Sequence, residues 1–339
     1  MLPWFQSRSV PLYLAPMAGV TDLVFRTLCK ELGADVMVTE FVSAEGVIRQ
    51  DERTRRYTEF TDGQRPVGVQ LFGADGERMG EAARKITAWK RPDFIDLNFG
   101  CPVNKVVAKN GGSSLLRDCP LLAATARAVV AACAPVGVPV TGKIRTGWDA
   151  GSVNAPDVCR LLEDCGVEAV AVHGRTRAQG YSGEADWEVI ARCAGAVSVP
   201  VIGNGDIASG ADVARRVRET GVRGLMIGRA AMQNPWVFRE AKHFLEHGDP
   251  GPQATLRQRW DLARRHARMA VAWGRYGDER QTVQAMRARL MAYSRGMPEG
   301  KRLRTRLSTV ASLAELDGIA RCHLEQAPPA GGILVAAGC

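Results

Sequence analysis

Short apolar runs, rich in β-branched residues, recur from Leu12 to Gly228. A Gly or polar turn follows each run, and then a stretch in which apolar residues have helical spacing. Eight alternating β and α units predict an α/β fold with a parallel (β/α)8 TIM barrel, because a doubly wound open sheet seldom has eight evenly distributed strands. The predicted strands are LYLAP (12–16), DVMVTEF (35–41), VGVQLF (67–72), FIDLNF (94–99), VPVTGKI (138–144), AVAVHG (169–174), VPVIGN (199–204) and GLMIG (224–228).

The alternation ends at HGDPGPQAT (247–255), whose Pro and Gly content is typical of a linker. The residues beyond it have helical periodicity, and Ser312 and Glu315 form a capping-box pattern that predicts the start of a final helix. We therefore predict a small C-terminal α-helical domain. The predicted parts are a barrel domain at 1–246, the linker at 247–255, the helical domain at 256–320 and a flexible tail at 321–339.

Within this helical region, apolar and basic residues separate onto different faces. The apolar stripe comprises Val283, Met286, Leu290, Tyr293 and Met297. The basic face carries Arg280, Arg287 and Arg295. Periodicity thus predicts a helix that buries one face and presents cations on another.

The charge of the chain is concentrated in the same region. Residues 250–306 contain 14 Lys or Arg against 4 Asp or Glu, whereas the whole chain carries a net charge of +9. Such local basicity favours a polyanionic partner, nucleic acid first, although a solvated helical surface would look alike. The residues we expect to contact RNA are Arg280, Arg287, Arg295, Lys301 and Arg302.

Composition excludes several classes of protein. With 46% hydrophobic and 24% charged residues the chain is globular rather than disordered. The most apolar segment, 123–140, contains Arg127 and two prolines, and no signal peptide opens the chain, so we expect a cytoplasmic protein with no membrane partner. Nine cysteines without a CxxC pair indicate neither a disulfide scaffold nor a metal site.

Polar side chains follow the predicted strands at their carboxyl ends, where the active site of a parallel barrel lies. The glycine turns at Asn204-Gly205-Asp206 and Gly228-Arg229 follow strands seven and eight, a common phosphate-binding position in barrels. Lys143 lies between apolar residues of the fifth strand and is predicted to point into the mouth, where it could form a Schiff base or hold an anion or an electron-rich ring.

Cys101 differs from the other cysteines because it lies between Gly and Pro in a turn at this mouth. An unperturbed thiol, with a pKa of about 8.5, is mostly protonated at neutral pH. Cys101 could therefore donate a proton, or act as a nucleophile if its pKa were lowered.

Taken together, the motifs between Leu12 and Phe244 resemble the bacterial, FMN-dependent tRNA-dihydrouridine synthase family. The basic helical segment resembles the family's tRNA-binding domain more loosely. The motifs, in order, are APMAGVTD, TEF, VQLFG, DLNFGCPVNKVVAKNGGSSLL, GKIRTGW, VHGRT, PVIGNGDI and MIGRAA.

The resemblance implies an enzyme that uses FMN, with NADPH as reductant, to reduce the C5–C6 double bond of specific uridines in tRNA. Hydride would pass from reduced FMN to C6, and Cys101 would donate a proton to C5. It also implies a set of substrate contacts, Asn98, Arg145 and Arg175. The implied cofactor contacts are Pro16, Met17, Ala18, Gln70, Lys143, His173, Asn204, Gly205, Asp206, Gly228 and Arg229. We expect a monomer.

Two other functions fit part of the pattern. An FMN oxidoreductase acting on a free pyrimidine would explain the barrel but would leave the basic helical region without a role. A barrel that binds RNA without catalysis would leave Cys101, Lys143 and the phosphate turns unexplained. Reduction of free uridine would indicate the first, and a colourless protein that cannot take up flavin would indicate the second.

Overall fold

The computed structural model describes residues 2–7, 9–103 and 111–326. The chain divides into two compact units, Met1–Pro252 and a second unit that begins at Gln253. Each unit is described by itself.

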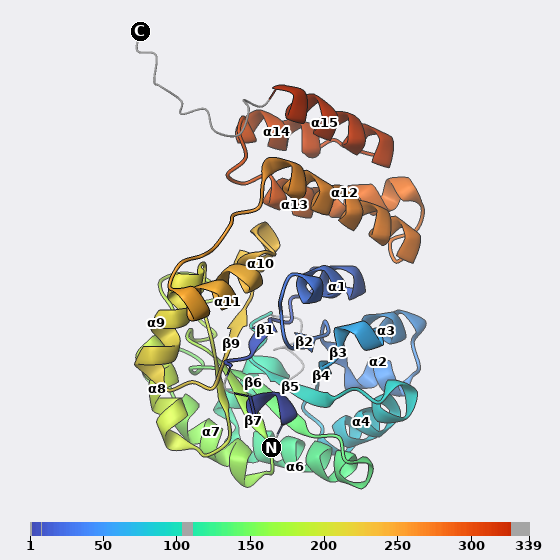
Figure 1. Ribbon diagram of the computed structural model, residues 1–339. Helices are drawn as coiled ribbons and strands as arrows, with labels where there is room; N and C mark the ends of the chain where they lie inside the picture. The colour runs from blue at the N-terminus through green and yellow to red at the C-terminus, as the bar shows by residue number, and fades with distance from the viewer. Residues whose placement is uncertain (1, 8, 104–110, 327–339) are drawn as a thin grey trace. The chain divides into compact units, whose positions relative to one another are not determined.

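The first unit is a parallel barrel, so the prediction of a (β/α)8 fold is confirmed (Figure 1). Neighbouring strands follow the order β1-β9-β8-β7-β6-β5-β4-β2, and a parallel bridge between Tyr13 and Val36 joins the two ends. The second predicted run, 35–41, is the exception, because its only strand is the two-residue β2, which pairs with β4. A second short strand, β3, begins just after the run and also pairs with β4. The strands are β1 (Leu12–Leu14), β2 (Met37–Val38), β3 (Val42–Ser43), β4 (Val67–Phe72), β5 (Phe94–Phe99), β6 (Val140–Arg145), β7 (Ala169–His173), β8 (Val201–Asn204) and β9 (Gly224–Ile227).

Helices cover the outside of the barrel (Figure 1). Several begin at a side-chain cap, as at Asp75, Asp186 and Ser209, whose oxygens accept the backbone N–H three residues on and satisfy an otherwise unpaired donor. The helices of this unit are α1 (Leu23–Glu31), α2 (Ala44–Ile48), α3 (Glu52–Tyr57), α4 (Gly76–Lys90), α6 (Cys119–Cys133), α7 (Ala155–Asp164), α8 (Trp187–Ala196), α9 (Gly210–Thr220), α10 (Arg229–Gln233) and α11 (Val237–His247).

Helix α6 is the most apolar of these. Among the described residues, Cys119–Val136 is long and apolar enough by composition to cross a membrane, and it overlaps the segment 123–140 in which the sequence predicts no membrane span. In the barrel, however, α6 packs against α4, and its Leu122, Ala126 and Val129 are fully buried. Of the stretch Cys119–Val136, 39% is buried within the structure.

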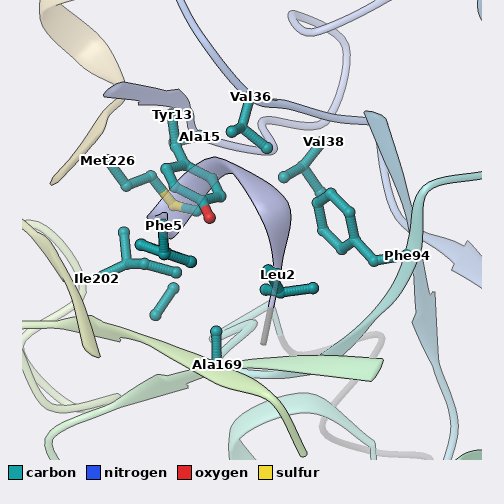
Figure 2. Close-up of a cluster of buried hydrophobic side chains, with 11 residues drawn as sticks. Leu2, Phe5, Tyr13, Ala15, Val36, Val38, Phe94, Ala169, Ile202 and Met226 are labelled. Carbon is teal, nitrogen blue, oxygen red and sulfur yellow. The ribbon is translucent and has the colours of Figure 1, made fainter. Parts of the chain in front are cut away.

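The amino-terminal end of the barrel is closed by a plug, the 3₁₀ helix η1 (Pro3–Phe5) with Leu2 (Figure 2). Leu2 and Phe5 pack among interior side chains that include Phe94 and Ala169, the first residues of β5 and β7. This apolar layer fills the lower part of the barrel and leaves the polar interior positions to the carboxyl ends of the strands.

The second unit consists of helices. Every residue of the predicted apolar stripe is buried, from Val283 to Met297. Ser312 Oγ accepts the Glu315 N–H as expected, whereas the Glu315 carboxylate accepts from Ala311 N. The helices are α12 (Leu256–Trp273), α13 (Glu279–Tyr293), α14 (Gly300–Leu307) and α15 (Leu313–Gln326). Residues 321–326, which we assigned to the tail, are helical, and 327–339 lie outside the described residues.

Candidate active site

A cavity of about 880 Å³ opens at the carboxyl ends of the strands. Its volume lies in the range that holds a small molecule or a cofactor. Most of the predicted site residues line it, although they come from strands far apart in sequence. Lining residues among those predicted are Pro16, Met17, Ala18, Gln70, Asn98, Cys101, Lys143, Arg145, His173, Asn204, Gly205, Asp206, Gly228 and Arg229. Residues 104–110 of the motif DLNFGCPVNKVVAKNGGSSLL lie outside the described residues.

Cys101 lies at the wall of this cavity, in the turn that follows β5. The Asn98 side chain holds the turn, since its Oδ1 accepts from Gly100 N at 3.2 Å and from Cys101 N at 2.9 Å. The residue is 7% exposed, and burial raises the pKa of the thiol above its usual value. The thiol is therefore neutral at neutral pH, which suits a proton donor and not a resting thiolate nucleophile.

Inside the barrel, next to this turn, three polar side chains are linked by hydrogen bonds: Asp96, Gln70 and Asn98. Strand register places Gln70 beside Asp96 and Asn98 beside Lys143. Asn98 Nδ2 donates to Gln70 Oε1 at 3.0 Å, and Gln70 Nε2 donates to Asp96 Oδ2 at 2.6 Å. Asp96 is absent from the predicted site, yet an acidic residue at an inward strand position, two residues before Asn98, could have indicated it.

Lys143 places a positive charge at the deep end of the cavity. Its Nζ donates to Asn204 Oδ1 at 3.1 Å, and Asn204 Nδ2 donates in turn to the Met226 carbonyl at 2.7 Å. Burial and the neighbouring Arg145 lower the pKa of Lys143 to about 8. Lys143 is thus protonated at neutral pH but close to its titration point.

His173 is the neutral member of the cavity wall. Burial lowers its pKa to about 2, and the nearby cations Lys143 and Arg145 act in the same direction. At any physiological pH its ring can therefore give or accept one hydrogen bond per nitrogen but carries no charge.

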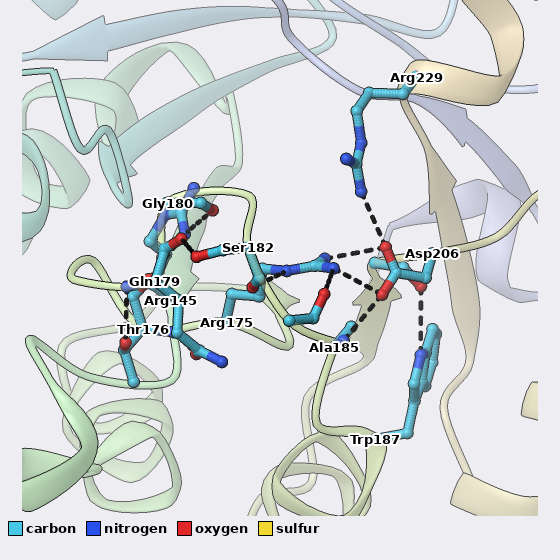
Figure 3. A network of polar contacts seen from close by, with 12 residues as sticks. Arg145, Arg175, Thr176, Gln179, Gly180, Ser182, Ala185, Trp187, Asp206 and Arg229 are labelled. Atoms are coloured by element: carbon cyan, nitrogen blue, oxygen red, sulfur yellow. Dashed lines mark hydrogen bonds and ion pairs between the residues drawn. The ribbon is translucent and has the colours of Figure 1, made fainter.

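Two predicted residues, Asp206 and Arg229, form an ion-pair cluster with Arg175 (Figure 3). Asp206 accepts from Arg175 through both carboxylate oxygens, at 2.9 and 2.8 Å, and from Arg229 at 2.8 Å. Burial opposes ionisation of Asp206, but the hydrogen bonds and the charge of Arg175 outweigh it and hold the pKa of Asp206 below its usual range. The carboxylate therefore orients the two guanidinium groups.

Arg175, predicted to contact substrate, is 2% exposed and is not among the residues that line the cavity. Its remaining donors bind the Ser182 and Gly183 carbonyls, so it holds the loop after β7. The backbone here is also constrained, because a Cβ on Gly205, whose φ is +134°, would lie 2.6 Å from the Ala185 Cβ.

Arg145 joins the two loops beside the cavity. Its side chain donates to the Gly100 carbonyl at 3.0 Å and to the carbonyls of Thr176 and Gly180 at 2.8 and 2.9 Å. Tyr181 also lines the cavity, 63% exposed, and the Arg145 and Arg229 guanidinium groups lie 5.8 and 5.2 Å from its ring centre. Tyr181 is not among the predicted site residues. It lies in a loop eight residues after His173, where no periodic sequence pattern indicates a position in the cavity.

The segment after β1 contributes backbone as well as side chains. The Met17 N–H donates to Thr21 Oγ1 at 2.9 Å, and the Met17 carbonyl accepts from Val20 and Thr21. This Met17 amide thus has a partner within its own turn, while Pro16 and Ala18 border the same cavity.

The five predicted RNA contacts lie in the second unit. Arg280, Arg295, Lys301 and Arg302 are exposed. Arg287 is half-buried, and its guanidinium donates to the carbonyls of Thr309 and Val310 at 2.7 and 2.8 Å. Arg287 therefore holds the segment between α14 and α15 and is the least available of the five for an external anion.

Comparison with known proteins gives consistent matches. Residues 13–327 match the family model described as dihydrouridine synthase. The chain is 43% identical to tRNA-dihydrouridine synthase B of Pseudomonas putida over 300 residues, 88% of this chain and 87% of that protein. It is 36% identical to a probable tRNA-dihydrouridine synthase of Aquifex aeolicus, with 89% and 92% covered.

Among solved structures, 6-hydroxypseudooxynicotine amine oxidase from Pseudomonas geniculata superposes with a TM-score of 0.53. The match covers 69% of this chain and 47% of that one at 15% identity, and it supports the fold alone.

Proposed function

Because this chain belongs to the dihydrouridine synthase family, we propose that it reduces the C5–C6 double bond of specific uridines in tRNA to give 5,6-dihydrouridine. One observation carries the mechanism. The neutral thiol of Cys101 lines the same cavity as the Lys143 cation and the side-chain amides of Gln70 and Asn98. Reduction of a uracil ring needs a hydride and a positioned proton donor, and the thiol suits the second task.

The donor set of the cavity fits FMN. Its deep end presents a cation, Lys143, and an amide, Gln70, which suit the polar edge of a flavin ring. Its other side presents the Arg229 guanidinium beside the glycine turns at Gly205 and Gly228, which suits a phosphate. The volume of about 880 Å³ also leaves room for a base beside a bound cofactor.

We therefore assign FMN to this cavity and NADPH as its reductant. Reduced FMN, when bound, supplies the hydride that C6 of the uracil accepts. Lys143 balances negative charge at the ring, and neutral His173 offers a hydrogen bond without adding a second cation. Arg229, held in place by Asp206, stands at the phosphate end.

On the substrate side, Cys101 delivers a proton to C5 and is left as a thiolate that solvent reprotonates. Burial disfavours that thiolate, while the charges of Arg145 and Lys143 favour it. Asn98 and Arg145 fix the turn from which the thiol acts. A base must leave its stack to enter such a cavity, and unstacked loop bases of a folded RNA meet that requirement.

The direct test is a visible spectrum of the purified protein, followed by NADPH addition with and without unmodified tRNA. We expect flavin bands that bleach with NADPH and return anaerobically only when tRNA is added. Bands that return with free uridine would indicate the small-molecule alternative. A protein that takes up no flavin would contradict the proposal.

Flavin affinity should depend on pH through Lys143. The lowered pKa of about 8 means that the cation is present below pH 8 and is lost as the pH rises above it. Because the ammonium form donates a stronger, charge-assisted hydrogen bond to the polar edge of the ring than the neutral amine does, the Kd for FMN should stay nearly constant from pH 6.5 to 7.5 and rise by up to about tenfold per pH unit above 8. Fluorescence titration of flavin-free protein measures this. Lys143→Met should bind more weakly with no such rise, and an equal rise in that variant would exclude Lys143 as the titrating group.

We also propose that the second unit binds tRNA through its exposed cations. Reversing Lys301 and Arg302 to Glu should weaken tRNA binding about tenfold or more and reduce its salt dependence, while NADPH still reduces the flavin. The double change Arg192→Glu and Arg218→Glu, at exposed positions on α8 and α9, alters the net charge by the same amount and is the control for charge alone. Filter binding at several salt concentrations measures the effect. Equal losses in both proteins would show only a general charge effect. Arg287→Glu is unsuitable, since it also breaks the bonds to Thr309 and Val310.

A further inference from the structure

A line of buried polar side chains runs from the barrel interior to the turn that carries Cys101. It begins at Asp96, which is 3% exposed and accepts from Thr141 Oγ1 and from Gln70 Nε2, each at 2.6 Å. It continues from Gln70 to Asn98 and ends at the backbone amides of Gly100 and Cys101. The links are hydrogen bonds of 2.6–3.2 Å, and the Asp96, Gln70 and Asn98 side chains that form them are buried.

The two ends of this line permit one orientation of the amides between them. An ionised carboxylate only accepts, so the NH₂ group of Gln70 faces Asp96 and the Gln70 carbonyl oxygen faces Asn98. Backbone amides only donate, so the carbonyl oxygen of Asn98 faces Gly100 and Cys101. A reversed Gln70 amide would set its carbonyl oxygen against the carboxylate.

We propose that Asp96 is a positioning residue of this site, whose carboxylate fixes the direction of the Gln70 and Asn98 amides and thereby the turn that carries Cys101. Its importance for proton transfer rests on the proposed function. The orientation itself does not, because it follows from donors and acceptors within the protein.

The arrangement tolerates titration of Asp96. Burial raises the pKa of the carboxyl group, and the charge of Lys143 on β6 opposes the rise. The other ionisable group that faces it is Tyr13 on β1, whose own pKa is raised, so that it stays neutral. If Asp96 is protonated, the Thr141 hydroxyl can accept in place of donating, whereas the Gln70 NH₂ group cannot. The bond to Gln70 therefore persists in both states.

Two substitutions at this position separate hydrogen bonding from size and charge. Asp96→Asn keeps an oxygen that can accept from Gln70, whereas Asp96→Leu has a similar size and accepts nothing. We expect Asp96→Leu to accelerate iodoacetamide labelling of Cys101, followed by mass spectrometry of the Cys101 peptide, by about tenfold, because the turn loses its fixed support. Asp96→Asn should stay within about twofold of the unmodified protein.

The second experiment tests whether the direction of the hydrogen bonds along this line can be reversed. Asn98→Asp alone places a carboxylate at each end of Gln70, which has one NH₂ group, and should lower Tm by about 5 °C or more. Adding Asp96→Asn should restore much of that loss, because the introduced amide donates to Gln70 and the line runs in the opposite direction. Adding Asp96→Leu removes the same charge without that donor and should restore less.

These outcomes decide the proposal. Rescue of Asn98→Asp by Asp96→Asn but not by Asp96→Leu supports it, and a soluble double variant beside an insoluble Asn98→Asp protein counts as the same rescue. Equal rescue by both would show that only charge repulsion matters and would overturn it, as would equal Cys101 labelling in the two single variants. Labelling and Tm need no tRNA or turnover. A wild-type protein without dihydrouridine synthesis would therefore contradict the proposed function and leave this inference standing.

Discussion

Replacing Cys101 with Ala should lower the rate of dihydrouridine formation by about 10²- to 10⁴-fold, the usual contribution of a positioned proton donor. The physical reason is that the buried, neutral thiol is the proton source we assign to C5 of the uracil. Flavin content and tRNA affinity should stay close to those of the unmodified protein, since the substitution removes one small side chain from the cavity wall. Single-turnover mixing of reduced enzyme with unmodified tRNA, with dihydrouridine quantified by mass spectrometry, measures the effect.

Cys119→Ala is the matched control for this experiment. Cys119 is also in the barrel unit and is half-buried, but it begins α6 and does not line the cavity. Its substitution should leave turnover unchanged. Full activity of Cys101→Ala would rule out the thiol as the acid, and a loss of flavin from that variant would show that its role is to hold the cofactor.

Replacing Asp206 with Ala should lower the free energy of unfolding of the barrel by about 3 kcal/mol, because it leaves the Arg175 guanidinium buried without its counter-charge. Arg175 is 2% exposed, whereas Asp206 is 32% exposed, so we place the cost at the lower end of the range for a broken buried pair. The expected fall in Tm is about 6–10 °C for a chain of this size. The variant should also bind FMN more weakly, since Arg229 loses the carboxylate that orients it.

The comparison should be made at neutral pH. The pKa of Asp206 is lowered in the folded protein, so its stabilising contribution is fully present above the unfolded value of about 3.9 and is lost as the pH falls through the folded value. Arg229→Ala is the control, because it removes only the partner that is 51% exposed and should cost less than about 1 kcal/mol. If Asp206→Ala and Arg229→Ala lowered Tm by similar amounts, the buried Arg175–Asp206 pair would contribute no more to stability than the exposed Arg229–Asp206 pair.

Much of the barrel could be predicted because its strands are apolar runs that repeat between helical stretches. The prediction was weakest at 35–41, where only the two residues of β2 form a strand, and the second short strand that pairs with β4, β3, lies beyond the end of the run. The predicted cavity residues were found because each lies in the carboxyl-terminal half of a strand or in the turn after it, and parallel strands bring their carboxyl ends together.

What a residue does within the cavity could not be predicted in the same way, because it depends on partners distant in sequence. Arg175 looked like a substrate contact, but it is buried against Asp206, which lies 31 positions further along the chain. Arg287 looked like a free cation, but it donates to carbonyls 22 and 23 positions away. The role of Asp96 becomes visible only because strand register places it beside Gln70. Sequence patterns report which side chains are buried or lie at an edge, and not which groups meet there.

The plug at the amino-terminal end of the barrel has a consequence for the order in which the chain folds. Leu2 and Phe5 precede every strand of the barrel in the chain, yet they pack in one cluster with Ile202 and Met226, and the Phe5 carbonyl accepts from Arg223 across 218 positions. Their binding surface exists only after β8 and β9 have been synthesised and have joined the sheet. Such a contact, so remote in sequence, adds to the contact order of the domain and slows its closure. Residues 2–5 are thus synthesised long before the strands that bury them.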